Sequence, residues 1–190
     1  GPEYAQGWSF NVPTAEFYNS FEEGDTRRDA TVLDIEAFAA ATGANYTEGY
    51  DHTGYFNNKY IPRAGESGGQ TELNYLTNFR IIRYSDVLLM AAEAYNRGGI
   101  DDGLAQEFLN QVRRRAFGGD DHDISASGTA LTDAIWEERK YELSLEGHRF
   151  FDLVRTGRAS STIAGFVEGK HEVFPIPQQE VDISGLTQNA

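Results

Sequence analysis

The sequence predicts a mainly α-helical fold in which helical hairpins carry long, irregular, aromatic-rich loops. Apolar residues recur at helical spacing beyond residue 80. Paired glycines end two of these runs, at Gly98-Gly99 and Gly118-Gly119. The segment 43–78 has no helical period and is rich in tyrosine, glycine and asparagine. We therefore expect one domain, 1–190, with a loop-rich part over 1–79 and a helical scaffold with an extended tail over 80–190.

Two short helices are expected in the loop-rich part. Thr14 is a suitable N-cap for a first helix that contains Phe17 and ends before Gly24. A second helix is expected from Asp34 to Thr42, closed by Gly43. The long loop that follows is of a kind that is usually functional within a compact domain.

Three helical segments are expected in the scaffold. Two of them are joined by a short loop and should pack as an antiparallel hairpin. Their apolar stripes are Val87, Leu88, Ala91, Ala92, Ala94 and Tyr95, and then Leu104, Phe108, Leu109, Val112 and Ala116. The third segment, 129–157, reads as one long helix interrupted near Gly147. Two prolines keep the segment 173–177 extended.

Composition excludes several functional classes. The chain has a net charge of −14, and both parts are acidic, so nucleic acid is not expected as a partner. It contains no cysteine, which excludes disulfides, cysteine–zinc sites and thiol catalysis. No stretch approaches the roughly 20 apolar residues of a membrane span. Hydrophobic residues make up 39% of the chain, enough to form a folded core.

Charged side chains recur every three or four residues along the third helical segment. We interpret them as a ladder of ion pairs that fixes how this helix docks, formed by Glu138, Arg139, Glu142, Glu146, Arg149, Asp152 and Arg155. A carboxylate-bridged metal site would need a Glu-x-x-His motif from each of two helices. Here His148 follows Glu146 by only two positions. We therefore expect no bound metal.

Motifs of common enzymes are absent from the sequence. There is no Gly-x-Ser-x-Gly elbow, no P-loop and no dinucleotide-binding fingerprint, so no cofactor is expected. The acidic turn 120–123 lacks the glycine and the distal glutamate of an EF-hand. A glycosidase pair of carboxylates depends on spatial separation, so the sequence leaves that alternative open. The expected class is a non-enzymatic binding or assembly module.

Several short segments, in order along the chain, together resemble the SusD/RagB family. Upstream the likeness extends to Pro13-Thr14, Phe21-Glu22 and the DTRR segment of 25–28. In the scaffold it rests on IRYSDVLLMAAEAYN (82–96), LNQVR (109–113), ERKYEL (138–143), EGHR (146–149), DLVRTG (152–157) and FPIPQ (174–178). Lys140, Tyr141 and His148 depart from the common family pattern.

The resemblance implies a fold, a location and a function. SusD-like proteins are surface lipoproteins of the outer membrane in Bacteroidota, built on tetratricopeptide-like helix pairs in an α-α superhelix. They capture glycans, or peptides in the RagB branch, without catalysis, and deliver them to a SusC-like TonB-dependent transporter. This chain would then be the C-terminal portion, and membrane attachment would depend on a lipid anchor outside it. A helical scaffold that binds proteins is the remaining alternative.

Aromatic side chains in loops are the expected ligand contacts, because sugar rings present apolar C–H faces that stack on them. No binding residue transfers from the family by motif. The candidates are therefore chosen from irregular, polar surroundings, and they are Trp8, Asn45, Tyr46, Tyr50, Asp51 and Tyr55. The alternative is that the tyrosines only pack the loop onto the helices. The aromatic residues of the helical segments are expected in the core, namely Phe108, Trp136, Phe150 and Phe151.

Overall fold

A computed structural model describes residues 11–49, 51–61, 66 and 76–189. The described chain is mainly helical, as the sequence predicts. The chain divides into two compact units, and the boundary falls between Leu145 and Glu146. The first unit contains α1 (Ala15–Asn19), α2 (Arg27–Thr31), β1 (Val32–Asp34), α3 (Ile35–Thr42), β2 (Tyr55–Asn57), α4 (Tyr84–Arg97), α5 (Asp102–Phe117) and α6 (Gly128–Glu142). The second contains α7 (Arg149–Arg155), α8 (Ala159–Thr162) and α9 (Gln178–Ser184). The finer expectations of a single domain and of a tetratricopeptide-like superhelix stay predictions.

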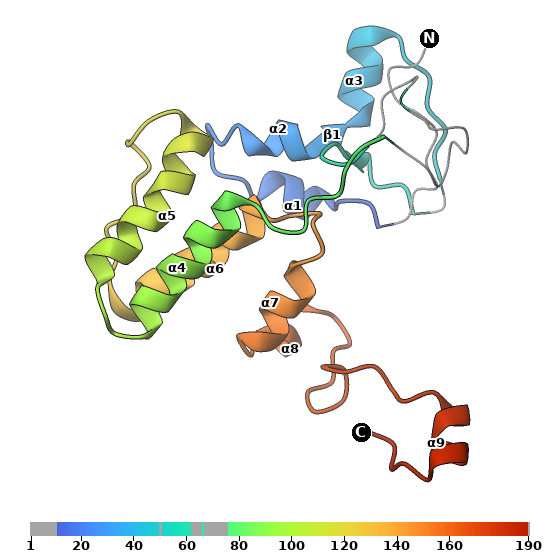
Figure 1. Cartoon of the computed structure of the whole chain (residues 1–190). Coiled ribbons are helices and arrows are strands. Elements are labelled where there is room, and N and C mark those ends of the chain that lie inside the picture. Colours follow the sequence, from blue (N-terminus) through green and yellow to red (C-terminus); the bar gives the residue numbers. More distant parts are fainter. Residues whose placement is uncertain (1–10, 50, 62–65, 67–75, 190) are drawn as a thin grey trace. The chain divides into compact units, whose positions relative to one another are not determined.

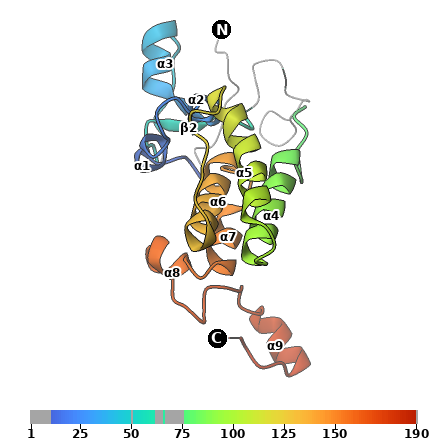
Figure 2. The same ribbon diagram turned by 90° about the vertical axis from the view of Figure 1, so that its left-hand side faces the viewer.

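Helices α4, α5 and α6 pack side by side and form the core of the first unit (Figures 1 and 2). The predicted antiparallel hairpin of α4 and α5 is confirmed. Each helix contributes its apolar stripe, and the buried residues are Leu88, Leu89, Ala92, Ala105, Leu109, Val112, Leu131 and Ile135. The predicted stripes contain Leu88, Ala92, Leu109 and Val112 of this core but lack Leu89 and Ala105. Two members of the first predicted stripe, Val87 and Ala94, are exposed.

The ends of these helices follow local sequence signals. The side chain of Asp101 accepts a hydrogen bond of 3.0 Å from the backbone N–H of Leu104, which caps the start of α5. Gly118 ends α5 in the left-handed conformation, with φ of 78°. The segment 118–127 then returns along the hairpin. Consequently α6 starts next to the start of α5, where Asp102 binds the backbone of Gly128 at 2.7 Å.

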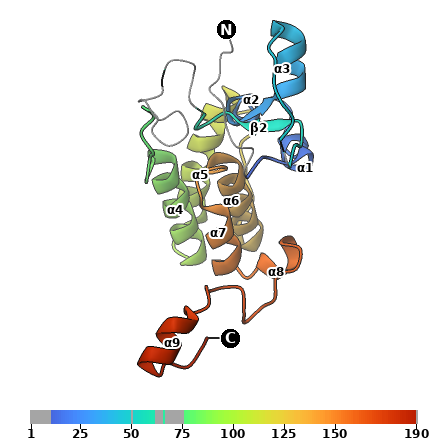
Figure 3. The same cartoon turned by 90° about the vertical axis from the view of Figure 1, so that its right-hand side faces the viewer.

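The N-terminal segment adds small elements to the helical core (Figure 3). Thr14 caps α1 as predicted, accepting a hydrogen bond of 3.1 Å from the N–H of Phe17. Gly43 ends α3, also as predicted, with φ of 72°. The sequence did not predict that β1 and β2 form an antiparallel pair, with Leu33 opposite Phe56. Strands of three residues are too short to show a period of two.

The predicted interruption of the third helical segment is confirmed. Helix α6 ends at Glu142 and α7 begins at Arg149. Two residues with positive φ lie between them, Leu145 at 62° and Gly147 at 85°. The second unit also contains α9, which the sequence did not predict, after a segment 173–177 without regular structure. None of the helices that the structure describes is long and apolar enough to cross a membrane.

The expected burial of the helical aromatic residues is partly wrong. Phe108 packs against the core of the first unit, as expected. In contrast, the exposed fraction is 39% for Phe150 and 68% for Phe151. Helix α7 has only seven residues, so it offers little buried face. Trp136 is half-buried and lines an open groove.

We expect the substitution Leu109→Ala to lower the free energy of unfolding by about 2–5 kcal/mol, because Leu109 is fully buried at the centre of the helical core. Urea unfolding followed by circular dichroism measures this loss. Ile81→Ala is the matched control, since Ile81 is 77% exposed and its truncation should change stability by at most about 0.5 kcal/mol. Equal losses in both variants would contradict the assigned core.

Candidate functional site

The loop expected to bind ligand contains a stack of three aromatic rings. Tyr46 stacks on His52 with ring centroids 5.5 Å apart, and His52 meets the edge of Phe56 at 5.8 Å. All three side chains are half-buried. The flanking residues Asn45 and Asp51 are exposed. The arrangement offers ring surface next to polar side chains.

Tyr55 belongs to a different stack. Its ring lies 4.5 Å from that of Tyr18 in α1, and the guanidinium of Arg28 lies 5.0 Å from the Tyr18 ring. Tyr55 and Phe56 are consecutive residues of β2, so their side chains point to opposite faces of the strand. Of the predicted ligand residues that the structure describes, Tyr46 and Tyr55 therefore lie in two different stacks.

The backbone of the loop is anchored at several points. The hydroxyl of Thr53 donates to the carbonyl of Pro13 at 2.6 Å. The backbone N–H of Ile35 donates to the backbone carbonyl of Gly54 at 3.1 Å. These bonds hold the Tyr55 strand against α1 and α3. Of the candidates, Trp8 and Tyr50 lie outside the described residues. Tyr18, His52 and Phe56 were not predicted from the sequence, yet they belong to these two stacks.

The surroundings of the first stack are acidic. Desolvation raises the pKa of Tyr46, and the nearby carboxylates of Glu36 and Glu48 raise it further. Asp34 is the N-cap of α3, where its side chain accepts a hydrogen bond of 2.9 Å from the N–H of Ala37. Such a surface favours neutral over anionic ligands.

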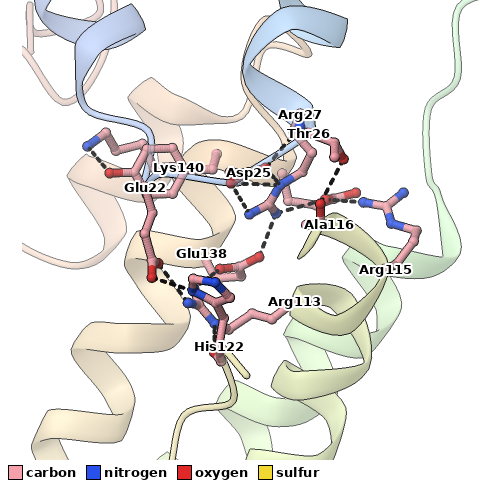
Figure 4. A network of polar contacts seen from close by, with 12 residues as sticks. Glu22, Asp25, Thr26, Arg27, Arg113, Arg115, Ala116, His122, Glu138 and Lys140 are labelled. Atoms are coloured by element: carbon pink, nitrogen blue, oxygen red, sulfur yellow. Dashed lines mark hydrogen bonds and ion pairs between the residues drawn. The ribbon is translucent and has the colours of Figure 1, made fainter. Parts of the chain in front are cut away.

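A second polar constellation is a buried cluster of ion pairs centred on Arg27 (Figure 4). Arg27 is only 8% exposed. Its guanidinium donates to Asp25 at 2.6 Å, to Glu138 at 2.5 Å and to Glu142 at 3.1 Å. Burial alone would lower the pKa of Arg27, but its bonds to Asp25 and Glu138 raise it. The guanidinium therefore stays charged and joins α2 to α6.

Glu142 receives guanidinium groups from two further elements. Arg83, at the start of α4, donates to its carboxylate at 2.8 Å, and Arg115 of α5 pairs with the same carboxylate. Burial alone would raise the pKa of Glu142. The hydrogen bond from Arg83 and the charge of Arg115 instead lower it to about 2. Glu142 is thus a fixed anion of the interior.

The predicted ion-pair ladder takes a different form in the structure. Its members in α6 pair with other elements: Glu138 pairs with Arg113 of α5 at 2.9 Å, and Arg139 pairs with Asp86 of α4 at 2.7 Å. The helix ends at Glu142, so no single helical face continues from there to Arg149. Spacing within the segment was therefore a poor guide to these partners.

The remaining members of the predicted ladder lie in the second unit. Glu146 is buried in the break before α7. Arg149 begins α7, which also contains Asp152 and Arg155. These last two residues pair at 2.7 Å with the predicted spacing of three. Only this pair follows the helical pattern among the contacts described above.

The first unit is thus a helical scaffold, tied together by buried ion pairs, that carries an aromatic loop. The model of the SusD family matches residues 1–171, and the chain belongs to this family. SusD-like protein P2 of Formosa agariphila is 33% identical over 80% of the chain and 32% of its own length. SusD-like protein P25 of the same organism is 27% identical over 96% of the chain and 34% of its own length. The chain spans about a third of the length of these curated relatives.

Several solved structures are similar to this chain in both fold and sequence. A laminarin-binding SusD-like protein is 42% identical, with a TM-score of 0.83 over 100% of this chain and 40% of that one. Surface glycan-binding protein A from Bacteroides thetaiotaomicron, solved in complex with laminarihexaose, is 34% identical, with a TM-score of 0.82 over 98% of this chain and 43% of that one. Surface glycan-binding protein A from Bacteroides fluxus is 34% identical, with a TM-score of 0.84 over 98% of this chain and 42% of that one.

We expect Glu142→Gln to destabilise the chain in a pH-dependent way. Lowering the pKa of Glu142 from its ordinary 4.5 to about 2 corresponds to roughly 3 kcal/mol of stability. Because the folded-state pKa is depressed, this contribution is present above pH 4.5 and is lost as the pH falls towards 2. The free energies of unfolding of wild type and variant should therefore differ most at pH 7 and converge by about pH 2.

Urea unfolding at pH 7, 4 and 3 tests this expectation. Glu107→Gln is the control, because Glu107 makes a partly exposed pair with Arg114 that should contribute less than about 1 kcal/mol. A difference between wild type and Glu142→Gln that stays constant from pH 7 to pH 3 would show that the charge of Glu142 does not stabilise the fold.

Proposed function

We propose that this chain is part of a surface protein that captures glycans without transforming them. The observation that carries this proposal is the 34–42% identity, over at least 98% of the chain, to proteins whose structures are described as binding laminarin or laminarihexaose. The same similarity favours a neutral glucan as the ligand. The net charge of −14 agrees with that choice, since it disfavours anionic polysaccharides.

The Tyr46 stack is the part of the described chain that we propose to border the ligand. Tyr46 presents ring surface beside the exposed side chains of Asn45 and Asp51, which supply hydrogen-bond groups for hydroxyls. Tyr55 is the weaker candidate, because its ring packs on Tyr18. Trp8 and Tyr50 remain candidates on their sequence surroundings alone.

The lack of catalysis is part of the proposal and rests on the carboxylates of the cluster. A glycosidase needs one carboxyl group that can donate a proton. Glu142 is held as an anion by Arg83 and Arg115, with its pKa at about 2. Glu138 is bonded by both Arg27 and Arg113. Groups that are saturated by guanidinium donors are suited to holding elements together.

The proposed partner and location rest on family membership. We propose that the intact protein is lipid-anchored on the outer membrane and delivers glycan to a SusC-like TonB-dependent transporter. A peptide ligand, as in the RagB branch, and a purely protein-binding scaffold are the alternatives that binding experiments distinguish.

We expect Tyr46→Ala to weaken the binding of neutral glucans about tenfold, which corresponds to about 1.4 kcal/mol. The loss follows from removing the ring surface on which the sugar would stack. Isothermal titration calorimetry of the 190-residue chain and of the intact protein, with laminarihexaose and with charged polysaccharides and peptides, measures it. Tyr84→Ala is the matched control, because Tyr84 is 72% exposed on α4.

The outcomes separate the alternatives. Tyr55→Ala should lower stability more than affinity, since its ring is engaged with Tyr18. If peptides bind and no glycan does, the proposal fails in favour of a peptide-binding protein. Release of reducing sugar from any bound glycan would show catalysis and would contradict the non-enzymatic role.

A further inference from the structure

A groove of about 450 Å³ opens between the end of α4 and the beginning of α6. It is lined by side chains of both helices: Asn96, Arg97, Thr129, Thr132, Asp133 and Trp136. Its volume lies within the range of about 300–1,000 Å³ that is typical of small-molecule sites. None of the residues proposed above as ligand contacts belongs to it.

The back of the groove is held by a polar network around Asn96. This buried side chain donates to Asp102 at 2.7 Å and to the carbonyl of Gly128 at 3.0 Å, and it accepts the hydroxyl of Thr132. Asp102 also accepts the N–H of Gly128 at 2.7 Å, and this bond lowers the pKa of Asp102. The network fixes α4, α5 and α6 to one another, so the groove exists before any ligand arrives.

A cationic side chain lies over the aromatic ring of this groove. The guanidinium of Arg97 is placed over the Trp136 ring, 5.6 Å from its centroid, in a cation–π contact. Arg97 is also held by Glu93, one helical turn earlier, at 2.9 Å. Thus the groove combines the half-buried indole surface of Trp136 with the hydrogen-bond donors and acceptors of Arg97 and Asp133.

These groups select a ligand of particular chemistry. An indole face suits a flat apolar surface, and the polar rim suits hydroxyl groups, a combination that a sugar ring presents. The charge of Arg97 is already balanced by Glu93, while Asp133 and Asp102 add negative charge to the groove and its back. An anionic sugar would be repelled, and a neutral one would not.

We propose that the Trp136 groove is a second carbohydrate contact, which takes one or two neutral hexose units of a longer glycan. This inference rests on the proposed glycan capture and adds a separate contact to it. The part of the Trp136 ring that Arg97 does not cover provides the stacking surface, and Asp133 and Arg97 bind hydroxyl groups along the rim. The Asn96 network holds the helices that carry these side chains in place and does not itself touch the ligand.

The experiment uses the indole N–H resonances of the 190-residue chain, which contains only two tryptophans, Trp8 and Trp136. Spectra of Trp136→Phe and Trp8→Phe assign the two signals. Laminarihexaose is then titrated, and calorimetry of the same samples gives the overall affinity. We expect the Trp136 signal to shift with the calorimetric midpoint, and Asp133→Ala, at an exposed position, to weaken binding about three- to tenfold.

Tyr84→Ala serves as the control for a surface change on α4 away from the groove, and should leave the affinity unchanged. If calorimetry records binding while the Trp136 signal stays still and Asp133→Ala binds normally, the groove is not a carbohydrate contact, although the proposed function stands. If neither heat nor a shift appears with any glycan, both proposals fail. A Trp136 shift only with cationic peptides would overturn the assignment of ligand class.

Discussion

The first unit depends on the burial of one arginine. Arg27 stands at the meeting point of α2 and α6, and its carboxylate partners Glu138 and Glu142 come from a helix more than 100 residues away in sequence. Together with four other guanidinium groups, it faces five carboxylates. The arginines are Arg27, Arg83, Arg113, Arg115 and Arg139, and the acids are Glu22, Asp25, Asp86, Glu138 and Glu142. Removing one partner would leave a buried charge uncompensated, which costs far more than an exposed pair contributes. The cluster therefore restricts how the N-terminal segment can pack on the helices.

The same cluster also determines where α6 ends. The last carbonyl groups of a helix lack partners within the helix. Here the carbonyl of Glu142 accepts from Lys59 at 2.9 Å and from Arg83 at 2.8 Å, and Lys59 reaches the carbonyl of Ser144 at 3.1 Å. Cations at a helix C-terminus are favourable for the helix dipole as well. The chain thus leaves the helix at a buried position where the carbonyl groups of Glu142 and Ser144 are hydrogen-bonded.

The sequence predicted features whose causes are local, and it failed where partners are distant. Thr14 caps the start of a helix and Gly43 and Gly118 end helices, through contacts within a few residues, and all three were recognised. Glu138 and Arg139 belong to the predicted row of charges, yet their partners come from α2, α4 and α5. Similarly, Tyr46 and Tyr55 were read as one patch, because nothing in three-residue strands reveals that β2 separates their stacks. Spacing describes one element, whereas these contacts are made between elements.

The return of the chain after α5 has a consequence for binding. Bonds from Asn110 and Gln106 to the segment 118–127 hold this return against α5, and so α6 runs parallel to α5 and antiparallel to α4. Trp136 and Glu142 lie six residues apart on α6, about 9 Å along the helix axis, and the rest of the groove extends from Trp136 towards Gly128 at the start of the helix. The Tyr46 loop belongs to the N-terminal segment, which the cluster fixes at the Glu142 end. A long glycan that touches both the loop and the groove would form the second contact at high effective concentration, so that two weak contacts would hold a polysaccharide more tightly than its short fragments.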